Sequence, residues 1–299
     1  MLSGLPLPPP RPREAHKGAM GRALLIGGAR GMAGAMHLAV GGALRAGPGY
    51  VLAALPAELA AGLHQAHPEA LVPPMPDQLD AEALPRLLEL AKSASAVGIG
   101  PGLGRAPGTA ALLLEFLRTL AKSGAELPCV LVADALNLLA AADAAHSFQW
   151  AELAPLALLI TPHPGEAARI LHANSPADRR ACWRSLVEVT GSCVLLKGAG
   201  SLIGDATTLR LDPPEPFENP TGNPGMATAG TGDVLTGILT GLLARGMSCL
   251  DGARLGAWLH GRAGDLAAEA GSPESLIAGD LIDFLPLAWR ELAHRAPNS

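Results

Sequence analysis

The chain has 299 residues, which is enough for one large domain or two small ones with a substantial core. Apolar residues make up 49% of the chain and charged residues 16%, and the formal net charge is -5. The sequence contains no basic stripe, so composition and charge argue against a nucleic-acid partner held by phosphate contacts.

The N-terminal residues 1–13, MLSGLPLPPPRPR, are rich in proline and lack the uninterrupted apolar core of a signal peptide. We therefore predict a flexible tail over residues 1–13 and a single domain over residues 14–295. No run reaches about 18 apolar residues without Gly, Pro or a charge, which argues against a membrane span. The four cysteines lie far apart and form no CxxC pair. We therefore expect neither disulfides nor a zinc site, assign no metal ligands and expect a reducing cytoplasm.

Predicted strands and helices alternate along most of the chain. Short apolar runs predict strands at residues 22–26, 50–55, 94–99, 129–133, 156–160 and 193–196. Apolar residues at helical spacing predict helices at residues 35–46, 80–92, 109–122, 134–142, 165–171, 231–244, 251–270 and 280–292. This alternation predicts a parallel sheet with helices on both faces, to which segments 201–203 and 207–211 would add an antiparallel pair.

Five glycine-rich or polar motifs each follow a predicted strand. They read, in chain order, GGARGMAG, GPGLG, ADALN, TPHPGE and KGAGS. Ligand sites of open parallel sheets lie at the carboxyl ends of the strands, where all of these motifs would meet. Taken alone, the first motif could equally be a tightly packed strand-to-helix turn, and it is not a GxGxxG dinucleotide motif.

The segment at residues 219–246, NPTGNPGMATAGTGDVLTGILTGLLARG, predicts a phosphate site at the start of a helix. Gly230, Gly232 and Asp233 lie where a loop becomes the helix, so backbone N–H groups and the helix dipole would gather around an anion. Phosphate repels a carboxylate, so we interpret Asp233 as a general base for a hydroxyl that approaches the phosphate. The alternative is that Asp233 only stabilises the helix N-terminus, as acidic residues often do.

Three further side chains follow predicted strands. Lys197, at a strand end beside glycines, can reach a phosphate, although KGAGS could simply be a hairpin turn. His163 is held between Pro162 and Pro164, which makes a purely structural role harder to defend than for an isolated histidine. Asp134 could contribute to the site or could cap the helix that follows it.

The segment AGTGDVLTGILTGLLARG resembles the anion-hole signature of the ribokinase-like superfamily. The string NPGMATAGTGD is similar to the NAD(P)H-hydrate dehydratases, repair enzymes also known as the C-terminal YjeF domain, and HKG…IGG…GMAGA, TPHPGE and KG strengthen that resemblance. It spans about residues 16–285 and implies a ribokinase-like α/β domain, with a mostly parallel central sheet between two helical layers. The epimerase domain found at the N-terminus of some relatives is not expected in this chain.

The resemblance also implies roles for individual residues. Asp233 would be the catalytic base, and Ala35, Gly104, His163 and Asp233 would contact the hydrated nicotinamide substrate. The nucleotide would bind Lys197, Gly198, Ala199, Gly200, Ser201, Asn223, Gly225, Met226, Ala227, Gly230, Thr231 and Gly232. This chain departs from the family pattern at two places. Ser201 stands where a Thr is more usual. Val132 or its neighbour stands where the family usually has an additional Asp, so Asp134 is given only a secondary role through metal or water.

By this resemblance, the protein is expected to dehydrate the S-epimer of NAD(P)H hydrate with ADP or ATP, and with ADP if its source is bacterial. The hydrate hydroxyl would first be phosphorylated, with Asp233 accepting its proton and the N–H groups of residues 229–232 stabilising the phosphoryl charge. AMP or ADP would be released with phosphate, and Mg2+ would accompany the nucleotide. The Ala-rich helices suit subunit packing, so we expect a homo-oligomer such as a tetramer.

Two other functions fit part of the sequence. A small-molecule kinase of the same fold, such as a hydroxyethylthiazole kinase, shares GTGD but does not need GMAGA or TPHPGE. A non-catalytic nucleotide-binding or assembly protein also fits the scaffold, although Lys197 and Asp233 argue against it. A phosphorylated product that persists would favour the kinase, and tight ADP binding without turnover would favour the binding protein.

Overall fold

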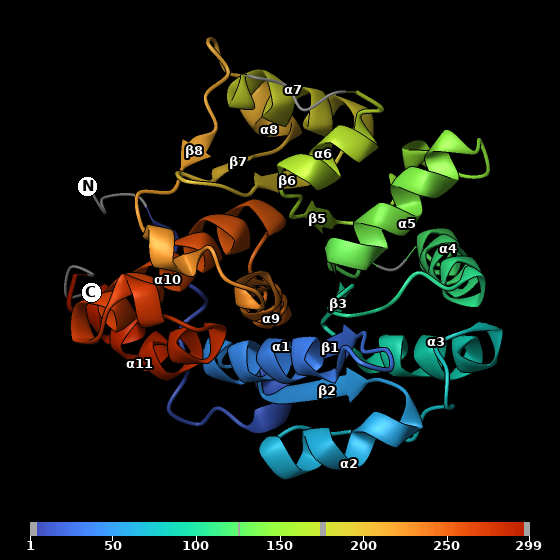
Figure 1. Ribbon diagram of the computed structural model, residues 1–299, viewed down its shortest axis with the longest axis horizontal. Helices are drawn as coiled ribbons and strands as arrows, with labels where there is room; N and C mark the ends of the chain where they lie inside the picture. The colour runs from blue at the N-terminus through green and yellow to red at the C-terminus, as the bar shows by residue number, and fades with distance from the viewer. Residues whose placement is uncertain (1–4, 125, 174–177, 296–299) are drawn as a thin grey trace.

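The computed structural model describes residues 5–124, 126–173 and 178–295. Its centre is an eight-stranded sheet with the order β2-β1-β3-β4-β5-β6-β7-β8 (Figure 1). The strands are β1 (Arg22–Ile26), β2 (Tyr50–Ala54), β3 (Ala96–Ile99), β4 (Cys129–Leu131), β5 (Leu158–Ile160), β6 (Cys193–Leu196), β7 (Leu202–Gly204) and β8 (Phe217–Glu218). Strands β1 to β6 pair in parallel, and β7 and β8 are antiparallel to their neighbours, so the predicted mostly parallel sheet is confirmed.

Helices cover both faces of this sheet. They are α1 (Ala33–Ala46), α2 (Ala57–Ala66), α3 (Leu84–Ser93), α4 (Pro107–Lys122), α5 (Ala133–Ala144), α6 (Pro164–Ile170), α7 (Arg179–Thr190), α8 (Ala206–Leu209), α9 (Thr231–Ala244), α10 (Cys249–Ala270) and α11 (Ala278–Arg295). Helices α1, α9 and α10 pack on one face, where α11 packs against them, and α3 to α7 lie on the other face (Figure 1). Within the described residues, no helix is both long enough and apolar enough to cross a membrane.

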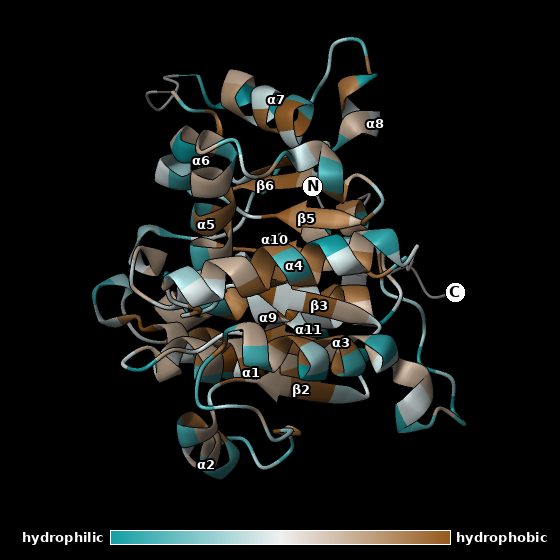
Figure 2. Cartoon of the chain, turned by 90° about the vertical axis from the view of Figure 1, so that its right-hand side faces the viewer, coloured by the Kyte–Doolittle hydropathy of each residue, from teal (hydrophilic) through white to brown (hydrophobic). Residues whose placement is uncertain are grey.

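The central strands are buried from both sides. In β1, Leu24 and Ile26 pack with the helices α3 to α7, whereas Ala23 and Leu25 face α9 and α1. Strands β5 and β6 are hydrophobic along their length (Figure 2). Continuous apolar runs are typical of parallel strands with helices on both faces, and they explain why these strands were predictable.

Helix α9 packs directly on its neighbours because glycines lie at the contacts. A Cβ atom added at Gly237 of α9 would lie 2.0 Å from the carbonyl oxygen of Ala39 in α1. A Cβ at Gly98 of β3 would lie 2.3 Å from Oγ1 of Thr240 in α9. Side chains do not tolerate such distances, so these glycines permit the close approach that brings the first turn of α9 to the carboxyl ends of the strands.

Part of the sequence prediction was wrong. Residues 207–211 were expected to form a strand, but α8 forms there instead, because Asp205 caps its N–H groups in a capping box. Strand β7 pairs antiparallel with β6 on one side and with β8 on the other. Helices α2 and α7 were not predicted, although Trp183, Leu186 and Val187 form an apolar stripe on α7 at helical spacing.

The Pro-rich segment at the N-terminus is described from residue 5 onward. The Arg11 guanidinium donates to the carbonyl oxygen of Gly47 at 2.7 Å, and Arg245 donates to that of Pro9 at 3.3 Å. Residues 5–13 thus contact the domain, and residues 1–4 of the predicted tail lie outside the described residues. The boundary between tail and domain at residue 14 stays a prediction.

Candidate functional site

A cavity of about 500 Å³ opens at the carboxyl ends of the strands. It lies between the turn after β6, the loop before α9, the first turn of α9 and helix α10. Its walls include most of the residues predicted to bind the nucleotide, namely Lys197, Gly198, Ala199, Gly200, Ser201, Asn223, Met226, Ala227, Thr231 and Gly232. The volume is within the range of about 300–1,000 Å³ that is typical of small-molecule sites.

Two glycines of the predicted nucleotide set lie behind this wall. A Cβ at Gly225 would lie 2.4 Å from the carbonyl oxygen of Pro273, so this glycine packs the loop against the segment after α10. Gly230 has a φ of 92°, a left-handed conformation that favours glycine, and a Cβ there would lie 2.4 Å from Cδ1 of Leu38. Both glycines therefore set the path of the backbone behind the cavity.

The KGAGS motif is both the turn of the β6–β7 hairpin and part of the cavity wall. Arg179 of α7 donates hydrogen bonds to the carbonyl oxygens of Ala199 and Gly200, the latter at 3.1 Å. The Ser201 hydroxyl donates to the carbonyl oxygen of Gly198 at 3.1 Å. The two interpretations of KGAGS that the sequence left open are therefore compatible, and these contacts hold the turn in shape.

Helix α10 contributes residues that the sequence analysis did not assign to the site. His260 lines the cavity, and its Nε2 lies 2.8 Å from the carbonyl oxygen of Thr231. Burial lowers the pKa of His260 to about 4, so the ring is neutral at pH 7 and donates through Nε2. Asp265 accepts hydrogen bonds from the Gly222 N–H at 3.0 Å and from Nδ2 of Asn223 at 3.2 Å. The available signal was that these polar side chains interrupt a helix of mostly small and apolar residues.

Asp233 lies in the first turn of α9, directly after the cavity residues Thr231 and Gly232. Helix α9 has no side-chain cap, and no other residue in the described part of the chain donates a hydrogen bond to the Asp233 carboxylate. Asp233 therefore does not cap α9 through a hydrogen bond, and the alternative that its charge interacts with the helix dipole stays open beside a role toward a ligand. Burial raises the pKa of Asp233 to about 6, an effect that Lys197 opposes and Asp134 reinforces. A carboxyl group with such a pKa suits a general base at neutral pH.

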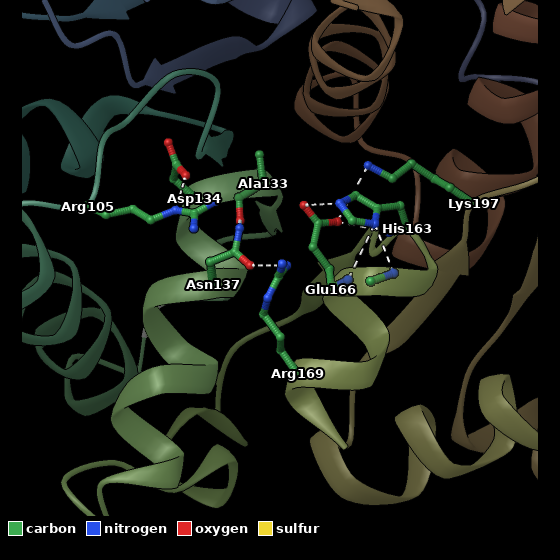
Figure 3. A network of polar contacts seen from close by, with 9 residues as sticks. Arg105, Ala133, Asp134, Asn137, His163, Glu166, Arg169 and Lys197 are labelled. Atoms are coloured by element: carbon green, nitrogen blue, oxygen red, sulfur yellow. Dashed lines mark hydrogen bonds and ion pairs between the residues drawn. The ribbon is translucent and has the colours of Figure 1, made fainter. Parts of the chain in front are cut away.

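Asp134 connects α5 to the loop after β3. Its Oδ2 accepts a hydrogen bond from the Gly104 N–H at 3.0 Å, and its Oδ1 accepts one from Nε of Arg105 at 2.6 Å (Figure 3). The alternative in which Asp134 caps α5 is wrong, because that helix has no side-chain cap and Asp134 lies in its first turn. The same loop contains Gly102 and Gly104. A Cβ at Gly102 would lie 3.1 Å from the Cβ of Ala35 in α1, so the predicted substrate residue Ala35 packs against the loop that carries the other, Gly104.

His163 begins α6 and forms a capping box with Glu166. The His163 Nδ1 accepts from the N–H groups of Gly165 at 3.0 Å and Glu166 at 3.4 Å, and Oε2 of Glu166 accepts from the His163 N–H at 2.8 Å. The same carboxylate lies 3.7 Å from Nζ of Lys197 (Figure 3). Burial lowers the pKa of His163, which Glu166 opposes and Lys197 reinforces. The predicted substrate histidine is therefore held rigidly and is linked to the nucleotide side through Glu166.

Asn137 of the ADALN motif joins α5 to α6. Its Nδ2 donates to the carbonyl oxygen of Ala133 at 2.9 Å, and its Oδ1 accepts from Nη1 of Arg169 at 2.9 Å (Figure 3). The Asn137 side chain is buried, so these bonds are shielded from water. The ADALN and TPHPGE motifs are thereby held in one relative position.

The site has two groups of residues, and a charged side chain from each of them acts on Asp233. On one side lies the cavity with Lys197, and on the other lies the loop of Gly104 held by Asp134. The charges of Lys197 and Asp134 both affect the pKa of Asp233, so one charged side chain from each group acts on this carboxyl group. Such an arrangement can bring a hydroxyl of one ligand to a phosphate of another beside a carboxylate that takes the proton.

A family model described as NAD(P)H-hydrate dehydratase matches residues 23–287. The chain belongs to the NAD(P)H-hydrate dehydratase family. An ADP-dependent (S)-NAD(P)H-hydrate dehydratase from Neisseria meningitidis serogroup B is 38% identical over 284 residues, which cover 91% of this chain and 86% of that protein. A bifunctional NAD(P)H-hydrate repair enzyme from Moorella thermoacetica is 40% identical over 291 residues, or 95% of this chain and 52% of that protein. The chain thus spans about half the length of the bifunctional relatives it matches.

Solved structures agree with this family assignment. The ADP/ATP-dependent NAD(P)H-hydrate dehydratase from Bacillus subtilis, co-crystallised with ATP and Mg2+, is 29% identical with a TM-score of 0.76 over 95% of this chain and 94% of that chain. A ribokinase-like superfamily protein from Enterococcus faecalis V583 is 27% identical with a TM-score of 0.78 over 95% of this chain and 92% of that chain. The predicted family and ribokinase-like fold are therefore confirmed.

Proposed function

We propose that this protein dehydrates the S-epimer of NAD(P)H hydrate at the expense of ADP or ATP and so restores NAD(P)H. The observation that supports this most directly is the environment of Asp233, which follows the cavity residues Thr231 and Gly232 and whose pKa is affected by the charges of both Lys197 and Asp134. A kinase-like site with a free carboxylate at this point suits a substrate hydroxyl that attacks a phosphoryl group.

The first step transfers a phosphoryl group to the hydrate. Hydroxide is a poor leaving group, so the C6 hydroxyl of the hydrate attacks the terminal phosphorus of the nucleotide while Asp233 accepts the hydroxyl proton. The O–P bond to the nucleotide breaks, and AMP or ADP leaves. Because Asp233 has a pKa of about 6, it is mostly ionised at pH 7 and can act as this base.

The second step is an elimination. The phosphate leaves with the C6–O bonding electrons, the neighbouring ring carbon gives its proton to water or to the departing phosphate, and the electrons of that C–H bond form the ring double bond. The charge on the phosphoryl group needs binding partners in the first step. There, the N–H groups of residues 229–232 at the start of α9, together with Lys197, would bind the phosphoryl oxygens during their transfer to the hydrate. One well-placed donor of this kind contributes about 3 kcal/mol to transition-state stabilisation.

Mg2+ is expected with the nucleotide, as a proposal. Among the described residues, no three His, Cys, Asp or Glu side chains gather into a metal site of their own. Mg2+ in phosphoryl-transfer sites is bound mainly by the phosphates with only one or two carboxylates, so this donor set is compatible with it. Carboxylates in or beside the site that could contribute include Asp134, Asp233, Glu166 and Asp265, and the ion would neutralise charge on the phosphates.

The test is to incubate the protein with chemically hydrated NADH and either ADP or ATP. Recovery of the absorbance of reduced nicotinamide, dependent on the nucleotide, is the expected result, and the faster nucleotide identifies the co-substrate. A phosphorylated product that accumulates without recovery of absorbance would show a kinase instead. Tight ADP binding without any turnover would show a binding protein.

Two wider expectations stay predictions. We propose that the protein works in a reducing cytoplasm, in keeping with Cys129 and Cys193, which are buried free thiols. Burial raises the pKa of the Cys129 thiol to about 12, so this side chain stays an uncharged thiol. We also propose a homo-oligomer such as a tetramer, in keeping with the Ala-rich helices. Size-exclusion chromatography with light scattering would give the number of subunits.

A further inference from the structure

A second cavity, of about 630 Å³, opens at the carboxyl ends of β1, β2 and β3. Its walls come from residues 28–30 after β1, the start of α2 with Glu58, the segment 77–79, and Leu103 after β3. It shares no lining residue with the cavity proposed for ADP or ATP, although both lie at the same edge of the sheet. This edge therefore has room for a second ligand beside the nucleotide.

The cavity lies at a point of the sheet where open α/β proteins bind ligands. The strand order begins β2-β1-β3. From β1 the chain crosses to β2 through α1 on one face, and from β3 it crosses to β4 through α4 on the other face. A crevice forms where two such connections leave neighbouring strands in opposite directions. Residues 28–30 and Leu103, which line the cavity, belong to these two connections.

The cavity also borders the residues predicted to contact the hydrate. Leu103 lines it, and the next residue in the chain is Gly104. A Cβ at Gly104 would lie 3.2 Å from the Cβ of Ala29, which is another residue of the cavity wall. The second predicted substrate residue, Ala35, packs against the same loop. A hydrate bound at Ala35 and Gly104 would therefore have this cavity beside it.

The proposed substrate has a part that needs such a space. Hydrated NAD(P)H consists of the reacting nicotinamide riboside and an adenosine half, which carries the pyrophosphate. The hydrate and ADP or ATP must be bound together for phosphoryl transfer, so the adenosine half of the hydrate cannot occupy the nucleotide cavity. Leu79 and Leu103 are buried in the wall of the second cavity and give it the apolar surface that ligand rings contact.

Arg30, at the rim of this cavity, is available for a phosphate. Its Nη2 lies 2.8 Å from Oε2 of Glu58 and its Nε lies 3.1 Å from Oε1, so the guanidinium contacts both carboxylate oxygens. The Arg30 side chain is nevertheless 87% exposed. An exposed ion pair contributes little to stability, and a guanidinium binds phosphate in the same bidentate geometry. Arg30 can therefore exchange Glu58 for a phosphate without much loss of stability.

Asp77 supplies a hydrogen-bond acceptor from a different segment. It is exposed and lines the cavity, and none of the other described residues forms a hydrogen bond or an ion pair with it. In nucleotide sites of open parallel sheets, an acidic side chain accepts hydrogen bonds from ribose hydroxyls. Arg30 and Asp77 thus offer the two kinds of polar contact that a ribose phosphate requires.

We propose that this second cavity binds the adenosine half of the hydrated dinucleotide, with Arg30 on its phosphates and Asp77 on its ribose. In the free protein, Glu58 holds Arg30 at the rim, and the ligand replaces Glu58 on binding. The inference rests on the proposed dehydratase function, because that function supplies a dinucleotide as the second ligand. Arg30 contacts a part of the substrate that does not react, so it contributes to affinity and not to the proton transfer.

The first test measures the binding of the product NADH by its nicotinamide fluorescence, with saturating ADP to fill the nucleotide cavity. Arg30→Met should weaken NADH binding about tenfold, because it removes a charged bidentate contact. Reduced nicotinamide riboside lacks both phosphates and the adenosine, so it should bind the variant and the wild type equally. Unchanged NADH binding, or an equal loss with the riboside, would overturn the proposal.

A matched control and a second dinucleotide sharpen this test. Arg86→Met breaks another exposed ion pair, with Glu89 and outside the cavity, and should bind NADH as the wild type does. NADPH distinguishes the phosphates that could meet Arg30. Equal losses for NADH and NADPH in Arg30→Met would identify the pyrophosphate, and a larger loss for NADPH would identify the 2′-phosphate. Both phosphates belong to the adenosine half, so either result supports the subsite.

Glu58→Gln separates a ligand role of Arg30 from a structural role of the ion pair. Arg30→Met and Glu58→Gln both break this pair, so both would weaken NADH binding if the pair only held the loop after β1 to α2. In the proposal, Glu58 competes with the phosphate, so Glu58→Gln should bind NADH about threefold more tightly. Weaker binding by both variants would show a structural ion pair and refute the proposal.

Steady-state turnover separates this inference from the proposed function. With chemically hydrated NADH, Arg30→Met should raise the KM for the hydrate about tenfold and leave the KM for ADP as in the wild type. If the wild type restores no NADH although NADH binding depends on Arg30 as expected, the dehydratase proposal fails and the dinucleotide subsite stands. If the wild type restores NADH and the KM for the hydrate does not respond to Arg30→Met, the subsite fails and the proposed function stands.

Discussion

Two aspartates at helix N-termini of this protein have opposite environments. Asp205 caps α8, and its Oδ1 accepts hydrogen bonds from the N–H groups of Thr207 at 2.9 Å and Thr208 at 3.1 Å. Asp233 lies in the first turn of α9, and none of the other described residues donates a hydrogen bond to its carboxylate. Burial alone would raise the pKa of both carboxyl groups. At Asp205 the hydrogen bonds outweigh burial and hold the pKa below its usual value, whereas at Asp233 burial prevails and the pKa rises to about 6.

We interpret the difference as one between a carboxylate that serves the fold and one that, in the proposed function, serves a ligand. At Asp205, the negative charge is compensated within the protein, so ionisation stabilises the native state. At Asp233, the charge is left without a hydrogen-bond donor next to a cavity, so ionisation opposes folding and leaves the group available to a substrate. Each prediction below tests one consequence of this contrast.

The largest effect is expected on catalysis. Asp233→Asn removes the base but keeps the shape of the side chain, so the rate of NADH recovery should fall by about 10²–10⁴-fold. Asp205→Asn is the matched control, because the same substitution at a capping aspartate should leave the rate unchanged. Equal activity of the two variants would show that Asp233 is not the base.

The next effect concerns the free energy of unfolding. Asp233→Asn should lower activity but raise stability. A carboxyl whose pKa is raised on folding, here from 3.8 to about 6, loses native-state stability as the pH rises through that interval. At pH 7 the loss is complete and amounts to about 3 kcal/mol at most, so Asp233→Asn should be more stable than the wild type by up to that amount. Urea unfolding at pH 7 and at pH 4 measures this gain, which should shrink at the lower pH. A variant that is destabilised at pH 7 would contradict the unsatisfied state of Asp233.

A smaller effect is expected in the pH dependence of activity. Protonation of Asp233 removes the base, so kcat/KM should fall about tenfold for each unit below a pH of about 6. The measurement is a pH profile with hydrated NADH and ADP over the range in which the protein stays folded. An acid limb near pH 4, as for an ordinary carboxyl group, would remove the distinction between Asp233 and Asp205.

The smallest effect is the loss of the cap. Asp205→Ala removes the acceptor for the N–H groups of Thr207 and Thr208 and should cost about 1 kcal/mol of stability with no change in activity. Because the pKa of Asp205 is lowered on folding, its contribution is present above its unfolded pKa and should disappear as the pH falls through its folded pKa. Asp205→Asn, which can still cap, should lose less in the same unfolding experiment.

Features with a local cause were predictable from the sequence. The helix at residues 231–244 was predicted with the bounds of α9, since glycines precede it and an apolar stripe runs through it. The motif order along the strands predicted Lys197 and His163 at one edge of the sheet, because carboxyl ends of parallel strands meet there. The strand predicted at 207–211 failed because local capping by Asp205, which outweighs the apolar residues nearby, turns that segment into α8.

Features that depend on distant partners were not predictable. For Asp134 the sequence left a cap and a site role open, and only the structure shows that its partners are the Gly104 N–H and Arg105, about thirty residues earlier in the chain. The sequence analysis assigned no role to Glu166, and only the structure shows that its carboxylate lies beside both His163 and Lys197. His260 became part of the site because α10 packs beside the first turn of α9.

By itself, the sequence determined the family, the alternation of strands and helices, and which residue types would stand at the carboxyl edge of the sheet, because these follow from local patterns and short motifs. Only the tertiary structure decided which charges meet there. Whether a carboxylate is a cap, an anchor or a base depends on its burial and on donors brought from elsewhere in the chain, and no local pattern encodes the distance between them.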